Sequence, residues 1–386
     1  MLEDVVIAGI GQIQVGEHWE TSLRSQAARA VLAARREVPS LQPDMLVIGN
    51  MLGSTISHQA NLGALVADWA NLSGVDAPTV EASGASGGAA LRLGVMAVAS
   101  RQADVVVVLG VEKITDSVEG GQDRAVSQMM DTDFEAMPGL TPAGQAGLVM
   151  NRYMAQYRVP AGAFAGFAVN AHANGTHNPF AMYRKPINRQ RYDEAAIVAD
   201  PVNQMDVAPA ADGAAAVILT RQDLLPDGYS FPVVRVAASN IVTDSLALHD
   251  RTDPMLFQAA RLSSERAFRQ AGITPADVDL FELDDAYSIY AALQLEAAGF
   301  APAGQGWLLA QDGSIIPRGR IPICTLGGSK ARGNPIGAVG VYQAVEAVLQ
   351  LRGSAGGSQV PDARVALLQN WGGPASTVTT HVLTRD

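Results

Sequence analysis

One order of apolar segments occurs twice in the chain, and this repeat constrains the fold more than any other sequence feature. The first copy contains an apolar run, a helical pattern, a second apolar run, a Gly/Ser-rich turn, a helical pattern and a Val-rich run, at 4–13, 22–38, 44–52, 81–88, 89–102 and 103–113. Continuous apolar runs of strand length are typical of a sheet covered on both faces. The first copy therefore predicts an α/β unit with helices on both sides of its sheet.

The second copy keeps the same order. Its apolar runs, helical patterns and Gly-rich loop lie at 231–242, 255–272, 274–287, 326–353 and 363–376. Alternation of strands and helices alone is common to all α/β chains. Because the position of the Gly-rich turn within the order also agrees, we interpret the chain as an internal duplication.

The segment between the two copies has a different composition. It is rich in Met, Gln, Asn and Pro, with short helical patterns and turn signals such as HNPFAMYRKPI. A strand-like run at 212–220 then closes the first copy. We expect a first half formed by 1–113 and 205–225, an inserted loop domain over 114–204, and a second half over 226–386.

The charge of the chain argues against two classes of partner. There are 38 acidic and 27 basic residues, a formal net charge of −11, and no cluster of Lys and Arg. Recognition of a nucleic acid backbone needs such a cluster, so nucleic acid is not an expected partner. The longest apolar runs, such as 105–111, have strand length and are too short to span a membrane. No membrane association is expected.

Cys324 is the only cysteine of the chain. A single cysteine excludes intrachain disulfides and Cys-rich zinc sites, and we predict no metal site. The start of the chain, MLEDVVIAGIGQI, has acidic residues where a signal peptide carries basic ones. These features predict a cytoplasmic protein. Cys324 lies in a strand-like run, IPICTL, where a buried, unreactive thiol is the expected role.

Six segments together resemble the thiolase superfamily, and within it the sterol-carrier-protein-type and archaeal thiolases. They are VEASGASGGAALRLGVMAVASRQADVVVVLGVEKITD, NAHANGTHNPFAMYRKPI, DGAAAVIL, FELDDAY, GGSKARGNPIGAVGVYQAVEAVLQLRG and NWGGPAS, and they are spread over nearly the whole chain. The resemblance implies a duplicated five-layer α/β/α/β/α fold with an inserted loop domain, assembled as a homodimer or tetramer. It also implies chemistry at a carbon–carbon bond next to a coenzyme A thioester, which is the substrate, and no covalently bound cofactor.

The resemblance fails at the residues that carry thiolase chemistry. The family's nucleophilic cysteine matches Gly84, and the histidine of its GHP motif matches Asn334. The histidine of its HDAF or HDCF motif matches Asp284. Ser83 and Ser86 flank Gly84, but Asn334 is no general base for a serine. We therefore expect no covalent acyl intermediate.

The remaining residues suit a retro-aldol cleavage of a β-hydroxyacyl thioester. We expect Asp284 to act as the base, and Asn334 with the backbone N–H groups at Gly84 and Gly373 to stabilise the enolate oxygen. Glycine in place of cysteine would also leave space for a bulkier acyl group. Tyr287 or a second aspartate, Asp285, would supply the proton, although a packing role for the tyrosine and a turn role for Asp285 are the simpler interpretations.

The same resemblance suggests ligand contacts and a partner. Arg184, Lys185 and His172 are the candidate residues for binding coenzyme A, although a solvated pair and a structural histidine are common alternatives. Thiolase-like chains of this kind pair with a small zinc-ribbon and OB-fold protein of the DUF35 class. A branch of the family, the steroid side-chain aldolases, also lacks the cysteine, but it carries tyrosines at both histidine positions.

Three functions follow from these observations. The first is an aldolase-type carbon–carbon lyase acting on a β-hydroxyacyl-CoA, including a steroid side chain as a candidate acyl group. The second is a non-catalytic thiolase-like scaffold or acyl-CoA-binding subunit. The third is an acetyl-CoA acyltransferase, which the change at both histidine positions makes the weakest of the three.

Overall fold

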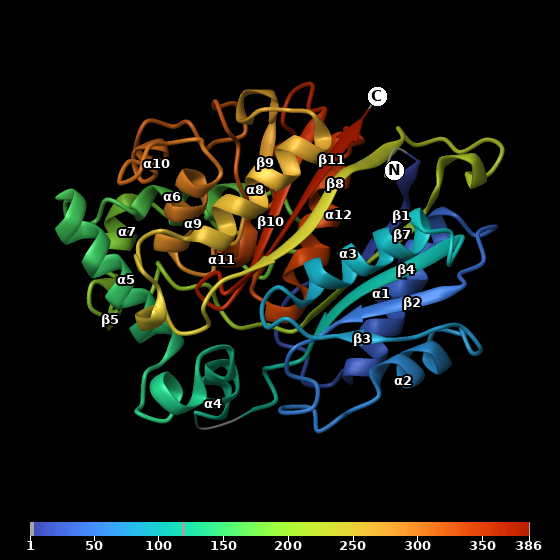
Figure 1. Ribbon diagram of the computed structural model, residues 1–386, viewed down its shortest axis with the longest axis horizontal. Helices are drawn as coiled ribbons and strands as arrows, with labels where there is room; N and C mark the ends of the chain where they lie inside the picture. The colour runs from blue at the N-terminus through green and yellow to red at the C-terminus, as the bar shows by residue number, and fades with distance from the viewer. Residues whose placement is uncertain (1–3, 118–119, 386) are drawn as a thin grey trace.

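The computed structural model describes residues 4–117 and 120–385 (Figure 1). Its main feature is one mixed sheet of nine strands in the order β3-β2-β4-β7-β1-β8-β11-β10-β9. The first five belong to the first half and the last four to the second half. They are β1 Val5–Gln12, β2 Met45–Gly49, β3 Thr79–Val80, β4 Val105–Glu112, β7 Gly213–Arg221, β8 Val234–Thr243, β9 Leu280–Glu282, β10 Val365–Gly372 and β11 Thr377–Arg385.

The strand pairing confirms the duplication. In the first half β2 is parallel to β4, while β7 is antiparallel to both β4 and β1. In the second half β9 is parallel to β10, while β11 is antiparallel to both β10 and β8. The two halves join where β1 and β8 pair antiparallel, through Val6 with Arg235 and Ile7 with Val234. Counted outward from this junction, β1, β7, β4 and β2 of the first half correspond to β8, β11, β10 and β9 of the second half. Strand β3 has no counterpart.

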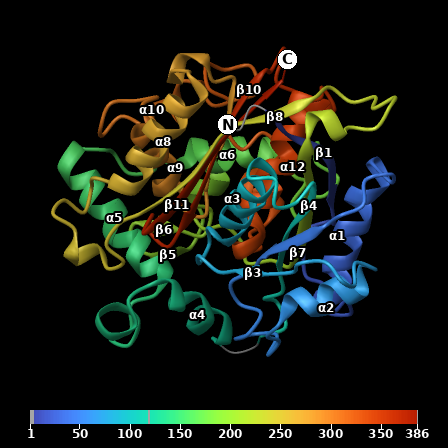
Figure 2. The ribbon, with the colours of Figure 1, turned by 45° about the vertical axis from the view of Figure 1, so that its right-hand side comes forward.

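Helices cover the sheet in three layers, so the five-layer expectation is confirmed. Two central helices lie between the two parts of the sheet, while the others cover its outer faces (Figures 1 and 2). The central pair is α3 Ser86–Ala99 and α12 Val339–Leu351; the outer helices are α1 Leu23–Glu37 and α2 Leu62–Trp69 in the first half, and α8 Gln258–Ala271 and α9 Ser288–Ala297 in the second half. One hydrophobic cluster joins α3 and α12 to strands of both halves.

Glycine allows the two central helices to approach closely. A Cβ atom on Gly340 would lie 2.4 Å from the backbone nitrogen of Gly88, which is closer than real side chains come. Each Gly-rich segment of the sequence thus supplies one of the two glycines, Gly88 and Gly340, at the contact between α3 and α12. They bring the start of each central helix into the middle of the molecule.

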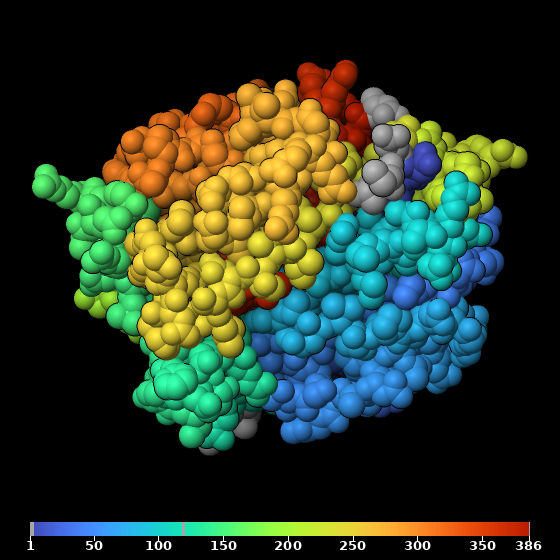
Figure 3. Space-filling model, in the orientation of Figure 1, coloured from blue at the N-terminus to red at the C-terminus, as the bar shows by residue number. Residues whose placement is uncertain are grey.

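The segment between the halves packs against the second half. Its elements are α4 Gly121–Val126, α5 Pro142–Tyr157, α6 Ala165–Gly175, α7 Arg189–Asp193, β5 Ile197–Ala199 and β6 Val202–Asn203. Helices α5 and α6 contact α9, and α6 also contacts the short helices α10 Leu308–Gln311 and α11 Gly328–Arg332. Figure 3 shows the blue-green part of this segment below the yellow surface of the second half, and its bright green part at the left edge beside that half. The boundaries of 114–204 stay a prediction.

The structure contains a strand that the sequence analysis missed, β11, although its run TVTTHVLTR is rich in β-branched residues. The segment 274–287 was expected to form a turn and a strand. It forms a 3₁₀ turn at Pro275–Asp277 and the three-residue strand β9, which pairs with β10 over Leu280–Glu282. No helix in the described residues is long and apolar enough to cross a membrane.

Candidate active site

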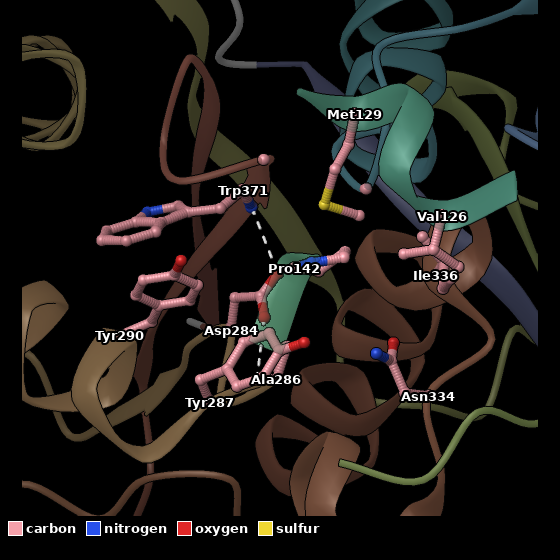
Figure 4. A pocket seen from close by; sticks show the side chains of 12 residues that line it. Val126, Met129, Pro142, Asp284, Ala286, Tyr287, Tyr290, Asn334, Ile336 and Trp371 are labelled. Carbon is pink, nitrogen blue, oxygen red and sulfur yellow. Dashed lines mark hydrogen bonds between the residues drawn. The ribbon is translucent and has the colours of Figure 1, made fainter. Parts of the chain in front are cut away.

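The five predicted catalytic positions line one small cavity of about 70 Å³ between the two halves. The strand β10, the turn before α3 and the loop between β9 and α9 meet there. The lining residues are Gly84, Val126, Met129, Pro142, Asp284, Ala286, Tyr287, Tyr290, Asn334, Ile336, Trp371 and Gly373. Figure 4 shows Trp371 and Tyr290 on one side of Asp284, Val126 and Ile336 on the other, and the ring of Tyr287 below Asp284. The site is thus a mainly apolar cavity with one carboxylate in it.

Asp284 is held from several directions. Its Oδ1 atom accepts a hydrogen bond from the Ala286 N–H at 3.0 Å. Its Oδ2 atom faces two donors at 3.4 Å, the Asn370 side-chain amide and the Trp371 N–H. Its backbone N–H donates to the Gln294 Oε1 atom at 3.0 Å. These contacts fix the carboxylate without a cationic partner in direct contact.

Burial raises the pKa of Asp284 to about 6. The adjacent Asp285 carboxylate raises it further, whereas the hydrogen bonds from Ala286 and Trp371 and the charge of Arg332 lower it. A carboxylate with a pKa of about 6 is ionised at neutral pH but is a stronger base than an ordinary aspartate. This combination suits a group that takes a proton and later gives it back.

The same pKa predicts a pH-dependent effect of Asp284→Asn on stability. The folded-state pKa lies above the unfolded value of about 4, so the wild-type protein loses stability as the pH rises through 6, and the asparagine variant does not. The stability of the variant relative to wild type should therefore increase by about 2 kcal/mol between pH 4 and pH 8. Urea unfolding at both pH values measures this difference.

Asp312→Asn is the matched control for that measurement. Hydrogen bonds from Ser314 lower the pKa of the exposed Asp312. Its carboxylate therefore stabilises the folded state at high pH, and the relative stability of this variant should fall as the pH rises. A relative stability of Asp284→Asn that does not change with pH would contradict a buried charge at position 284.

Gly84 lies in the cavity, but the expectation that it leaves extra space is wrong. A Cβ atom at this position would lie 2.5 Å from the carbonyl oxygen of Trp371. The end of strand β10 therefore occupies the place where a side chain at residue 84 would begin. Ser83, next to it, adopts the left-handed backbone conformation with φ of 56°. The turn before α3 is therefore packed against β10, while Gly84 still forms part of the cavity lining.

Asn334 and Tyr287 complete the polar lining. The Asn334 backbone is held by Pro209 and Ala211, at 2.9 and 3.3 Å, and its side-chain amide turns toward the cavity (Figure 4). Tyr287 packs edge-on against Tyr290, with ring centroids 5.4 Å apart. Burial and the charges of Asp123 and Asp284 raise the pKa of Tyr287, so its hydroxyl stays protonated. It is suited to donate a proton and not to remove one.

Four other residues with possible roles lie outside the cavity lining. Asp285 accepts hydrogen bonds from the backbone of α11, at 2.6 Å from Ser329, which is a structural role. Ser86 bonds within its own turn, to Ala82 and Ser83, and the Ser83 hydroxyl contacts the Met51 sulfur. Cys324 is buried in the hydrophobic core, and burial raises its pKa. Among the described residues, no thiol, serine or threonine lines the cavity.

Sequence analysis missed three residues that position Asp284. Trp371 and Asn370 donate to its carboxylate, and both stand in the NWGGP motif directly before Gly373, so the motif itself was a signal. Gln294 is completely buried on α9, and its amide clamps both backbone groups of Asp284. Its place in the otherwise apolar run YAALQL, before Glu296, was the only sign of it.

The three predicted coenzyme A residues do not share one pocket. His172 lines a separate cavity, where its ring stacks on Tyr183 with centroids 5.9 Å apart. Arg184 and Lys185 are exposed and line none of the described pockets. A contact of Arg184 and Lys185 with a phosphate of coenzyme A stays a prediction.

Comparison with known proteins gives the family. The sequence profile described as "Thiolase, N-terminal domain" matches residues 5–223, and that described as "Thiolase C-terminal domain-like" matches residues 241–385. The chain belongs to the thiolase superfamily. It is 37% identical over its full length to an acetyl-CoA acetyltransferase of Methanothermobacter thermautotrophicus, which it also covers completely. It is 27% identical to sterol carrier protein 2 of Oryctolagus cuniculus, over 98% of this chain and 72% of that protein.

A solved structure shares the fold of this thiolase-family chain. It is described as "Ltp2-ChsH2(DUF35) aldolase", with a TM-score of 0.85, 23% identity, and coverage of 100% of this chain and 99% of that one. At this identity the likeness concerns the fold alone. The expected fold and family are thus confirmed, and within the family both an aldolase and an acetyltransferase are among the similar proteins.

Proposed function

We propose that this thiolase-family protein cleaves a carbon–carbon bond of a β-hydroxyacyl-CoA by a retro-aldol reaction. One observation carries the proposal: a buried carboxylate, Asp284, lies in the cavity while no thiol, serine or threonine lines it among the described residues. A carboxylate can remove a proton, and the described lining offers no cysteine, serine or threonine to carry an acyl group through a covalent step.

The proposed reaction uses residues of this cavity in three roles. Asp284 removes the proton of the β-hydroxyl group, the bond between Cα and Cβ breaks, and its electron pair passes to the thioester as an enolate. Cβ becomes the carbonyl carbon of a ketone or aldehyde. Asn334 and the backbone N–H groups at Gly84 and Gly373 stabilise the enolate oxygen. Tyr287 then protonates Cα, giving a shorter acyl-CoA, and recovers its proton from Asp284 directly or through water.

The proposal also includes the location and the assembly. We infer a homodimer or tetramer in the cytosol, working with a zinc-ribbon and OB-fold partner of the DUF35 class. The name of the structural neighbour, an aldolase with a DUF35 protein, supports the partner. Its low identity to this chain makes the partner part of the proposal.

Two other functions keep some support. The name of the relative at 37% identity favours acetyl transfer, but the chain offers no acyl carrier at position 84. The replacement of the family's cysteine by Gly84 and of its GHP histidine by Asn334 favours a subunit that binds acyl-CoA without turning it over. Each makes a distinct prediction for the protein mixed with substrate.

The test is incubation of the protein, with and without a DUF35-type partner, with a tertiary β-hydroxyacyl-CoA. Mass spectrometry should detect a ketone and a shortened acyl-CoA in equal amounts. Tight binding without either product would favour the non-catalytic subunit. A mass increase of the protein by one acyl group would favour the acyltransferase.

The pKa of Asp284 predicts the pH dependence of the cleavage. The base must be ionised, and its pKa is about 6. The value of kcat/KM should therefore rise with pH through about 6, and at pH 5 it should be about 10-fold below the plateau. Stopped assays between pH 5 and pH 8 measure this curve. A rate independent of pH over this range would exclude Asp284 as the base.

A further inference from the structure

A second cavity is lined in part by the segment Val207–Pro209 and does not include Asp284 in its lining. It has a volume of about 450 Å³ and we refer to it as the far cavity. A third cavity of about 500 Å³ adjoins both. It shares Tyr287, Asn334 and Ile336 with the cavity of Asp284, and Val207–Pro209 with the far cavity. The three cavities are therefore neighbours that share parts of their walls.

Lys330 lines the far cavity and is 2% exposed. Its ammonium group donates to the carbonyl oxygen of Asp206, and the described residues offer it no second acceptor. An ammonium group has three donors, so two are unused. The carboxylates of Asp206 and Asp285 act on Lys330 through their charges but accept hydrogen bonds from other donors. That of Asp206 accepts from the Tyr192 hydroxyl at 2.8 Å, and that of Asp285 from the Ser329 N–H at 2.6 Å.

Two further residues of the lining, His172 and Arg191, are also of basic type. His172 has a buried Nδ1 atom with no hydrogen-bond partner, and Arg191 stands exposed at the rim. Among the lining residues that the structure describes, none is acidic. In a protein with a net charge of −11, this lining carries Lys330 and Arg191 and no carboxylate, while the charges of Asp206 and Asp285 act on Lys330 from outside the lining. A buried cation with unused donors is costly unless a ligand supplies the acceptors.

We propose that the far cavity binds a carboxylate group at the remote end of the acyl chain. The substrate class is then a CoA thioester whose acyl group carries a second, free carboxylate. This inference rests on the proposed function, because it assumes that the thioester lies in the cavity of Asp284. The carboxylate oxygens would accept from Lys330 and Arg191.

The lining favours a carboxylate over a phosphate of coenzyme A. Apart from Lys330 and a few other polar residues, the lining of the far cavity consists largely of apolar side chains such as Ile187, Val198 and Val207. An acyl chain passes such surfaces favourably, whereas the nucleotide of coenzyme A carries several charges that need solvent or several cations. One buried ammonium group matches a single carboxylate.

Calorimetric titration tests the inference without turnover. The probes are octanedioyl-CoA, which ends in a carboxylate, octanoyl-CoA, which does not, and coenzyme A alone. Wild-type protein should bind octanedioyl-CoA at least about 10-fold more tightly than octanoyl-CoA, because the carboxylate forms charge-assisted hydrogen bonds. Lys330→Met keeps the length of the side chain but removes the ammonium group, and it should abolish most of this preference.

Two further variants make the result specific. Arg191→Gln changes an exposed residue, so it should fold normally and reduce the preference in part. Arg269→Gln, on the outer helix α8, should leave it unchanged. Equal binding of both thioesters by wild-type protein would overturn the inference, as would a preference that survives Lys330→Met. A loss of affinity for coenzyme A alone in Lys330→Met would assign the far cavity to a phosphate instead.

The result of this binding test can be distinguished from the result of the cleavage test of the proposed function. Binding preferences are measured with thioesters that lack a β-hydroxyl group and cannot be cleaved by a retro-aldol reaction. A clear preference together with absent cleavage of any β-hydroxyacyl-CoA would leave the carboxylate site in place and remove the lyase. Cleavage without a preference would do the reverse.

Discussion

Asp284→Asn should lower kcat/KM for cleavage of a β-hydroxyacyl-CoA by about 100- to 10,000-fold, the usual loss when a general base is removed. Asparagine keeps the size of the side chain and its oxygen can still accept from the Ala286 N–H, so the local fold should persist. It cannot remove a proton at neutral pH. Steady-state kinetics with mass-spectrometric detection of both products gives the number.

The control for this variant is Asp123→Asn. Asp123 lines the adjoining cavity and acts on Tyr287 through its charge, but it does not line the cavity of Asp284. Its loss should change the rate by less than about 10-fold, the size expected of a neighbouring charge and not of a base. Comparable losses in the two variants would mean that general electrostatics, and not proton removal by Asp284, limits the reaction.

Gly84→Cys should not create an acetyltransferase, although it restores the residue type of the family's nucleophile. The new Cβ would lie 2.5 Å from the Trp371 carbonyl oxygen, so strand β10 or the turn before α3 must move. We expect a destabilisation of about 1–3 kcal/mol from this overlap. Asn334 moreover provides no base to form the thiolate.

Gly16→Cys separates the overlap from the mere presence of a second thiol. A Cβ at Gly16 would meet no atom within 4 Å, so this variant should keep the stability of the wild-type protein. Urea unfolding of both variants, and an acetyl transfer assay with acetyl-CoA, provide the comparison. Transfer of acetyl groups by Gly84→Cys would show that the cavity needs only a thiol, and our assignment of Asn334 would then be wrong.

Much of the fold was predictable because the pattern repeats. The strands at 4–13 and 103–113 and the helix at 22–38 correspond to β1, β4 and α1 within a few residues. Strand β11 was not predicted, because it begins at Thr377, directly after the last segment assigned to the second copy, 363–376. The family resemblance supplied the layer order, which local periodicity cannot give.

The candidate site was predictable as a set of positions but not as an environment. Motif matching selected Asp284, Asn334 and Gly373, and these line one cavity. The clamp by Gln294 was not predictable, since hydrogen bonding between a loop and a helix face depends on how α9 is rotated. The far cavity was likewise hidden, because Lys330 reads in the sequence as one more polar residue of a loop.

The amino-acid sequence by itself determined the duplicated α/β architecture and the absence of a nucleophile at residue 84. Both are written in local patterns and in residue identity. Only the tertiary structure decided that the Asp284 carboxylate is buried and faces the donors of Trp371 and Asn370 in place of water. It also decided that a backbone carbonyl fills the space beside Gly84. Desolvation and close contact arise between segments that are more than 80 residues apart, so no local pattern contains them.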